Sequence, residues 1–264
     1  MDITVRGYDH QTNLIDYNTL INLLKKQSFN DKSRNDILET IVNTIIPINL
    51  FNLRTLLKCY SFDDDKIKAV KILQNNNKLA ANSDFHDIPF VLSCMSFEEG
   101  KIAMLKTLCN VYKVIDLRLI TEIVQIFSFD DTKLKAFNTV YYAETNESVC
   151  TCNVVYLLRT FSFDDSRMSV MQRLKGCQIA NKTELSNLLK VFSFDKYKVL
   201  KMIRLPDNLT TDDLAEIISN FACGKDEYKQ LCEEFWISDD IMKRYEENVK
   251  SNSISFWGFN IRWG

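Results

Sequence analysis

The stretch Phe127-Ser128-Phe129-Asp130-Asp131-Thr132-Lys133 carries the pattern around which most of this chain is organised. Close copies of the pattern begin at four other serines, Ser61, Ser96, Ser162 and Ser193. Degraded copies begin at Ser28 and Asn220. The copies start roughly 27 to 35 residues apart, which is a spacing typical of helical repeat arrays. The sequence therefore predicts a repeat protein.

Each copy has the composition expected where one helix ends and the next begins. If Asp63 is the N-cap of a helix, its carboxylate accepts hydrogen bonds from the N–H groups of the first turn, worth about 1 kcal/mol. Phe62 and Ile67 then have the spacing of a hydrophobic staple, so we expect this phenylalanine to be buried at the corner. The same staple recurs as Phe97/Ile102, Phe129/Leu134, Phe163/Met168 and Phe194/Val199.

The charged residues of the corners admit two other interpretations. Calcium takes six to eight oxygen ligands, whereas each corner supplies only two or three carboxylates, so capping is favoured over metal binding. The recurrent cations are possible components of a basic ridge; they are Lys66, Lys101, Lys133, Arg167 and Lys198. Because an acid stands beside nearly every one of them, a balanced, solvated face is favoured over a nucleic-acid track.

The F-S-F-D-x-x-K/R corners, spaced about 33 residues apart, resemble a family of α-helical repeat domains catalogued only as a domain of unknown function. The resemblance covers about residues 50–205. It implies an all-α repeat fold and supplies no activity, ligand or catalytic residue. The copies at 28 and 220 depart from the pattern, because Arg34 replaces the staple aliphatic and Ala222 has no side chain that can cap. Atypical terminal repeats are expected in such arrays.

The composition is that of a packed helical protein. Of 264 residues, 46% are hydrophobic, and only six Gly and three Pro are present, which argues against a loop-rich or all-β chain. The net charge of −2 gives no general attraction to nucleic acid or to anionic membranes. No run of about 18 apolar residues occurs, so we expect no membrane span.

The cysteines and the start of the chain indicate a cytoplasmic protein. Met1-Asp2-Ile3 lacks the basic start and apolar core of a signal peptide. The eight cysteines are scattered, and several lie in apolar helical stretches, so we expect reduced thiols that act as small core residues. The one close pair, Cys150-x-Cys152, has too short a spacing for a redox or zinc motif.

No pattern typical of an active site was found in the sequence. His10 and His86 are the only histidines, and neither has a Ser or Cys partner in a recognisable motif. The chain has no phosphate-binding G-x-x-x-x-G-K-S/T loop and no G-x-G-x-x-G loop. We therefore expect no catalytic residues, no cofactor and no metal site, and the protein is interpreted as a non-enzyme.

The last residues, 251–264, differ from the rest. Trp257, Phe259, Ile261 and Trp263 alternate with Gly258, Asn260 and Arg262, and strict alternation predicts a β-strand. One hypothesis is that this strand folds back on its own chain. The other is that its four apolar side chains anchor a second copy or another partner, by strand addition or aromatic insertion.

Together these observations predict an all-α array of about six to seven antiparallel helix pairs, either right- or left-handed, with a short β-like tail. Residues 1–250 form one repeat domain with units starting near 28, 61, 96, 128, 162, 193 and 220, followed by the aromatic tail 251–264. The function favoured is a protein-interaction scaffold, because solenoids offer extended binding surfaces. Self-assembly through the tail is the alternative, and an enzyme is the least supported. We expect a protein partner or self-association, while a small-molecule ligand is left open.

Overall fold

The computed structural model describes residues 14–27, 30–81, 83–113, 116–141, 149–174, 177–194 and 196–249. Within these residues the chain forms fifteen α-helices, three short 3-10 helices and one pair of two-residue strands. The chain divides into two compact units. Unit 1 comprises residues 1–145 and 160–166, and unit 2 comprises residues 146–159 and 167–264.

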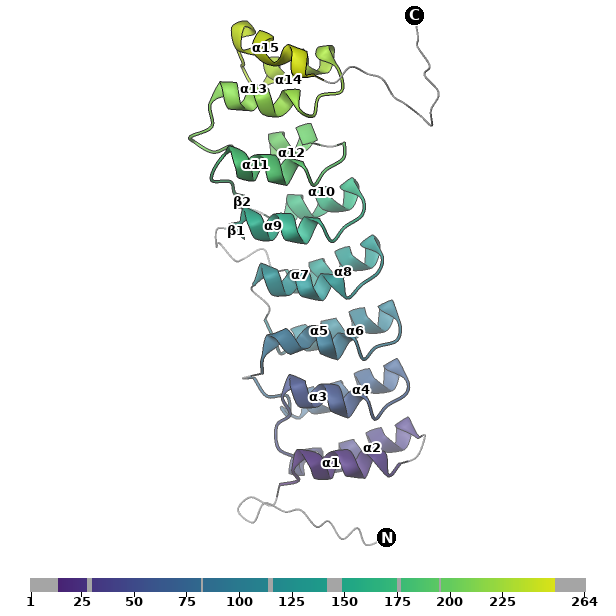
Figure 1. Ribbon diagram of the computed structural model, residues 1–264. Helices are drawn as coiled ribbons and strands as arrows, with labels where there is room; N and C mark the ends of the chain where they lie inside the picture. The colour runs from purple at the N-terminus through teal and green to yellow at the C-terminus, as the bar shows by residue number, and fades with distance from the viewer. Residues whose placement is uncertain are drawn as a thin grey trace, which may run out of the picture. The chain divides into compact units, whose positions relative to one another are not determined.

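Unit 1 contains consecutive helix pairs arranged in two layers (Figure 1). The pairs are α1 (Tyr17–Lys25) with α2 (Asp31–Ile41), α3 (Leu50–Leu57) with α4 (Asp63–Asn75), α5 (Ile88–Leu92) with α6 (Glu98–Cys109), and α7 (Leu117–Gln125) with α8 (Asp130–Val140). Two 3-10 helices, η1 (Val42–Thr44) and η2 (Phe85–Asp87), lie in the connections. The second helices α2, α4, α6 and α8 pack on one another in sequence order, and α5 packs between α3 and α7.

Unit 2 continues with helices of similar length. They are α9 (Thr151–Leu158), α10 (Asp164–Arg173, whose first turn belongs to unit 1), α11 (Lys182–Leu189), α12 (Lys196–Met202), α13 (Thr211–Ser219), α14 (Lys225–Glu234), α15 (Asp239–Tyr245) and η3 (Glu246–Asn248). Helix α9 packs on α11, and α13 packs on both α14 and α15. The prediction of an all-α array of sequential helix pairs is therefore confirmed.

The core of each pair is built from apolar residues at helical spacing. In α7, Ile120, Ile123 and Val124 are almost fully buried, and in α8 Ala136 and Phe137 are completely buried. These positions place the apolar side chains on one face of each helix. A single pair cannot cover that face alone, so the stacking of neighbouring pairs supplies the rest of the core.

The first helix of several pairs begins with a side-chain cap. Asn49 accepts a hydrogen bond from the Asn52 N–H at 2.8 Å at the start of α3. Asp116 accepts one from the Arg118 N–H at 2.9 Å at the start of α7. These bonds span two or three residues, so the local sequence is sufficient to predict them.

Short parallel β-bridges join the ends of the pairs that lie away from the corners. Ile15 pairs with Ile45, Ile48 pairs with Leu79, and in unit 2 β1 (Val149–Cys150) pairs with β2 (Cys177–Gln178). In each case a residue just before a first helix pairs with a residue that follows a second helix. The bridges satisfy backbone groups that the helices leave free at these connections. They involve too few residues to give a strand pattern in the sequence.

The two aromatic residues of each F-S-F corner have opposite environments. Phe127 is only 2% exposed, and its equivalents Tyr60 and Phe161 are also buried. Phe129, two residues later, is 68% exposed. The buried staple predicted for Phe62, Phe97, Phe129, Phe163 and Phe194 is therefore wrong, because all five side chains are 68% exposed or more.

This difference leads to a test with two neighbouring phenylalanines. Phe127→Ala should destabilise the protein by about 3–5 kcal/mol, because it leaves a cavity in a packed core. Phe129→Ala should change the stability by no more than about 0.5 kcal/mol, because the ring lies mostly in solvent. Urea unfolding of the two variants beside the wild type gives both values. Equal destabilisation by the two substitutions would contradict this assignment of inner and outer aromatic positions.

Candidate functional site

The acid that opens the second helix of a pair binds the corner of the following pair. Asp63 is the first residue of α4, and its two carboxylate oxygens accept hydrogen bonds from the backbone N–H of Ser96 at 2.9 and 3.0 Å. One of them also accepts from the N–H of Phe97 at 3.0 Å. Asp63 is not the N-cap of its own helix: Phe62 holds that position, and α4 has no side-chain cap. The predicted capping role is therefore wrong.

The same carboxylate contact recurs along unit 1. Asp31 accepts from the N–H groups of Ser61 and Phe62 at 2.6 and 2.9 Å, and Asp130 accepts from those of Ser162 and Phe163, both at 2.9 Å. Glu98, whose side chain is one carbon longer, accepts from the Ser128 N–H at 3.3 Å and from the Thr132 hydroxyl at 2.7 Å. We call this contact the carboxylate clamp.

Lysines three residues after the acids complete the clamps. The Lys66 ammonium group lies 3.2 Å from the Asp63 carboxylate and donates to the Cys94 carbonyl at 2.8 Å. Lys101 contacts Glu98 at 3.0 Å and donates to the Ile126 carbonyl at 3.2 Å. Lys133 donates to the Thr160 carbonyl at 2.5 Å and lies 3.7 Å from Asp130. The Cys94 and Ile126 carbonyls follow the last residues of the next first helices, α5 and α7, where a cation is favoured by the helix dipole.

These lysines therefore lie in a different environment from the one that the sequence suggested. The side chains of Lys66, Lys101 and Lys133 are largely buried, with at most 16% exposed. The predicted solvated basic face is wrong for these three residues. Arg34 has a related position in α2, where it pairs with Asp31 but donates to the Leu24 carbonyl of its own pair's first helix.

The clamps shift the ionisation of their acids. Burial raises the pKa of the Asp63 carboxyl, but the hydrogen bonds from the next corner and from Lys66 outweigh burial and hold the pKa below its usual range. The same balance, with burial opposed by hydrogen bonds and a nearby lysine, lowers the pKa of Glu98 and of Asp130. Each acid is therefore more firmly ionised in the folded chain than in the unfolded one.

The residue at the third position of the second helix is adjusted to the clamp that it faces. Thr132 donates its hydroxyl proton to Glu98, and Ser166 hydrogen-bonds to Asp130. Gly100 has the equivalent place opposite Asp63, where a Cβ would lie only 2.5 Å from the Asp63 Oδ2 atom. Glycine in this first turn therefore makes room for the carboxylate.

Gly100→Ala tests the close approach of these two residues. Alanine is favoured over glycine inside a helix by about 1 kcal/mol, yet here we expect the substitution to destabilise by about 1–3 kcal/mol through overpacking. In an Asp63→Ala background the same Gly100→Ala change should become neutral or stabilising. A double-mutant cycle in urea measures the coupling, and additive effects of the two substitutions would refute the steric explanation.

The clamps also predict acid sensitivity. A carboxylate whose pKa is lower in the folded state than in the unfolded state stabilises the fold above the unfolded value, and this contribution is lost as the pH falls through the folded value. Stability should therefore fall as the pH is lowered below about 4. Asp130→Asn should lower the stability at pH 7 and reduce this pH dependence, whereas Asn at the exposed neighbour Asp131 should leave it nearly unchanged. Parallel pH dependences for wild type and Asp130→Asn in urea unfolding would contradict the clamp.

The clamp also sets the direction of the exposed phenylalanines. With the N–H groups of Ser96 and Phe97 bound to Asp63, the corner backbone is held in an extended conformation. Phe62, Phe97 and Phe129 have nearly the same backbone angles, with φ between −102° and −116° and ψ between 140° and 150°. The side chains therefore leave the corners with the same backbone geometry.

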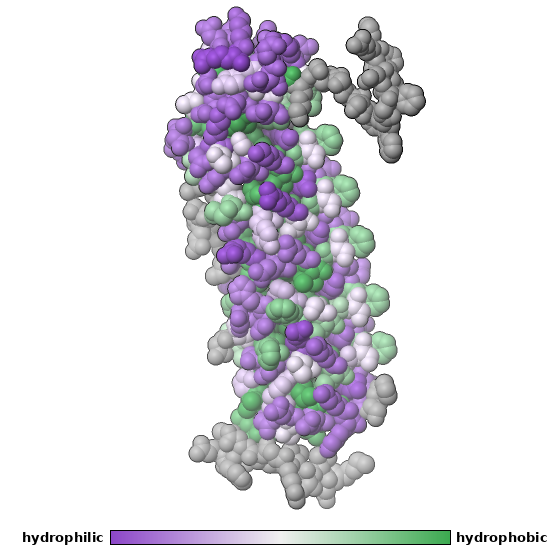
Figure 2. Space-filling view, in the orientation of Figure 1, coloured by the Kyte–Doolittle hydropathy of each residue, from purple (hydrophilic) through white to green (hydrophobic). Residues whose placement is uncertain are grey.

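Four phenylalanines of unit 1 share this position, and we call them the phenylalanine row: Phe62, Phe97, Phe129 and Phe163. Their exposed fractions lie between 68% and 70%. The serine before each of them is also exposed, as is the acid two residues after it. Figure 2 shows pale-green apolar side chains standing out one after another at the edge where the paired helices of unit 1 turn.

The sequence contains a signal for this row that the staple interpretation overlooked. The buried residue before the serine varies between copies, with Tyr60, Met95 and Phe127, as a packed position that tolerates similar volumes does. The second position is phenylalanine in every close copy. The identity of this second residue is therefore not explained by packing in the core, because its side chain is exposed in every close copy.

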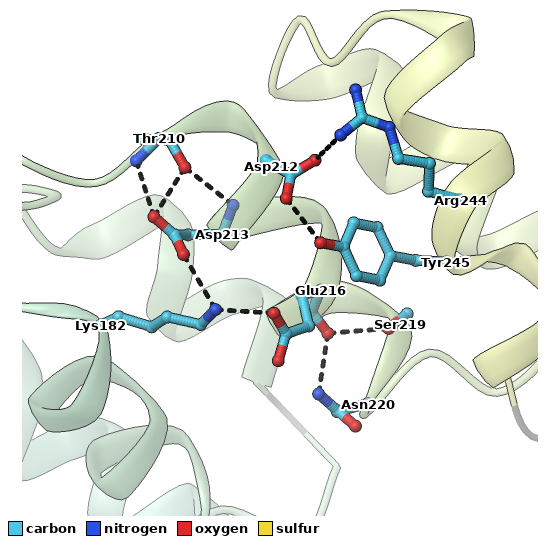
Figure 3. A network of polar contacts seen from close by, with 9 residues as sticks. All are labelled: Lys182, Thr210, Asp212, Asp213, Glu216, Ser219, Asn220, Arg244 and Tyr245. Carbon is cyan, nitrogen blue, oxygen red and sulfur yellow. Dashed lines mark hydrogen bonds and ion pairs between the residues drawn. The ribbon is translucent and has the colours of Figure 1, made fainter.

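A second polar network lies in unit 2 and serves packing (Figure 3). Lys182 at the start of α11 contacts Asp213 at 2.9 Å and Glu216 at 2.7 Å, both on α13. Asp212 accepts hydrogen bonds from Arg244 at 2.7 Å and from the Tyr245 hydroxyl at 2.6 Å, which ties α13 to α15. The contact with Lys182 lowers the pKa of Asp213 to about 2. All the charged groups of this network are paired with each other.

Histidine, metal-ligating side chains and long apolar helices are the other features of the described residues that bear on function. His86 lies on the surface, 3.4 Å from Glu122. No group of three or more His, Cys, Asp or Glu side chains suited to a metal occurs among the residues that the structure describes. Within the same residues, no helix has both the length and the apolar character required to cross a membrane. The tail residues Trp257, Phe259, Ile261 and Trp263 lie outside the described residues, so the β-like tail stays a prediction.

The sequence of this chain matches one known protein family. A family model described as "Domain of unknown function (DUF4476)" matches residues 11–78 and 111–194, which is more than half of the chain. The chain belongs to this family. No curated protein and no solved structure matches the chain.

The segments matched by the DUF4476 model contain part of the candidate site. Phe62, Phe129 and Phe163 of the phenylalanine row lie within them, and Phe97 lies in the unmatched interval. The family description names no activity or ligand. Function must therefore be argued from the residues of the site itself.

Proposed function

We propose that this protein is a non-enzymatic interaction module whose binding surface is the phenylalanine row. The observation that supports the proposal is the equal, high exposure of one aromatic residue at four successive corners. It is the repetition of the exposed ring in one position, rather than the exposure of any single ring, that favours a surface for a partner.

The area involved is appropriate for binding a chain segment. A phenylalanine can bury roughly 150–250 Å², so four rings that are about two-thirds exposed offer roughly 400–700 Å². That area is comparable with one side of a small protein interface. The rings stand on separate corners, so the surface suits an extended partner that meets them in turn rather than a compact one that needs a single patch.

The rigidity of the corners supports the same proposal. The N–H groups of Ser96 and Phe97 are bound by Asp63, and those of Ser162 and Phe163 by Asp130. A partner that meets the row therefore does not have to order the corner backbone, which lowers the entropic cost of binding. We also propose that the F-S-F-D-x-x-K/R corner is the recurring unit of the family.

A cytoplasmic location fits this proposed role. Cys59, Cys94, Cys109 and Cys232 are buried or half-buried, and all four are free thiols. Burial raises the pKa of the Cys109 thiol to about 11, which keeps it protonated and unreactive. Thiols in this state suit a reducing compartment.

Affinity capture from the native cells with matched variants tests the function. Phe97→Ser with Phe129→Ser should abolish retention of a protein that wild type retains, because two central anchors are lost. Phe51→Ser serves as the control, since Phe51 is 63% exposed on α3 but is not part of the row. Thermal unfolding should show that all variants fold. Retention of the same proteins by the double variant, identified by mass spectrometry, would overturn the proposal.

A further inference from the structure

We propose that the phenylalanine row binds an arginine-rich extended segment of a partner protein, with one arginine at each corner. This inference rests on the proposed function, because it assigns a chemical class to the partner of the same surface. The chemistry comes from the exposed residues next to each ring in the sequence. Two residues after the phenylalanine, unit 1 places an exposed acid: Asp64 after Phe62, Glu99 after Phe97 and Asp131 after Phe129.

These side chains together match one ligand group. A guanidinium stacks on an aromatic face and at the same time donates paired hydrogen bonds to a carboxylate, which an ammonium group does less well. The exposed serine before each ring adds a hydroxyl that can accept a further N–H. The acids in the clamps do not compete for the ligand, since Asp63, Glu98 and Asp130 are bound to the next corner.

The distance between successive corners matches the repeat distance of an extended peptide. Helices α4, α6 and α8 pack directly on one another, and packed helices lie about 8–10 Å apart. A polyproline II helix has three residues per turn and rises about 3.1 Å per residue, so it presents the same face every 9 Å or so. Arginine at every third residue of such a segment therefore meets successive corners of the row.

The corners with Asp64, Glu99 and Asp131 differ in their neighbouring charges, and this difference gives an internal check. One helical turn after Asp64 and after Asp131 stand exposed lysines, Lys68 and Lys135, which reduce the attraction for a cation. The equivalent residue after Glu99 is Ala103. Phe97 and Glu99 therefore form the strongest arginine site of the row.

Titration of the full chain with synthetic peptides tests the proposal. The probe is a peptide of four Arg-Pro-Pro triplets, which holds arginine at every third position of a polyproline helix. Two controls of equal charge replace arginine by lysine or place the four arginines in one block. We expect the triplet peptide to bind best, with calorimetry showing that Phe97→Ala weakens it by about two- to fivefold. Glu99→Gln should weaken binding more than Asp131→Asn, and Phe51→Ala should leave it unchanged.

The outcomes separate this inference from the proposed function. Equal binding of the three peptides, or binding that Phe97→Ala and Phe129→Ala leave intact, would show a non-specific charge effect and overturn the inference. If no peptide binds although the native partner is still lost from the row variants, the interaction module stands and the arginine-rich partner is wrong. A drop in mass of the row variants in light scattering would assign the row to a second copy, which also overturns the inference.

Discussion

The helix pairs of unit 1 depend on a carboxylate that binds the corner of the following pair. The acid at the start of a second helix is positioned where it would normally cap its own first turn. It reaches instead to the two N–H groups that precede the next second helix, as Asp63 does for Ser96 and Phe97. Those N–H groups have no acceptor inside their own helix, so the carboxylate of the preceding pair supplies the hydrogen-bond acceptor that they need. The same hydrogen bonds therefore join two neighbouring pairs and satisfy the backbone at the start of a helix.

The lysines explain why a buried acid is tolerated at this place. A carboxylate withdrawn from water is costly unless it is paired and hydrogen-bonded. Lys66 pairs with Asp63 and also donates to the Cys94 carbonyl at the end of the adjacent first helix. The carboxylate thus binds backbone N–H groups of the next pair and the ammonium group binds a backbone carbonyl of the same pair, so both charges are hydrogen-bonded.

Much of the fold follows from the sequence, and the limits have a physical cause. Helix periodicity, the repeat spacing and caps such as Asn49 and Asp116 are local, so the sequence predicts them. The role of Asp63 is not local, because its partners lie 33 and 34 residues away. A carboxylate that caps its own helix and one that binds the following pair would both stand at the start of a helix, so the sequence pattern is the same for the two roles. Phe97 belongs to the corner that Asp63 binds, so the environment of its ring also depends on this long-range contact, which the local sequence does not reveal.

The parallel bridges at the ends opposite the corners have a consequence for how such chains change length. Ile15 with Ile45 and Ile48 with Leu79 make the same contact one period apart, as the clamps do at the corners. A segment of one full period therefore carries matching connections at both of its sides. Loss or duplication of such a segment would leave the bridge and the carboxylate contact available at the new junction, so evolution can lengthen or shorten the protein in whole modules, with matching changes at positions such as Gly100.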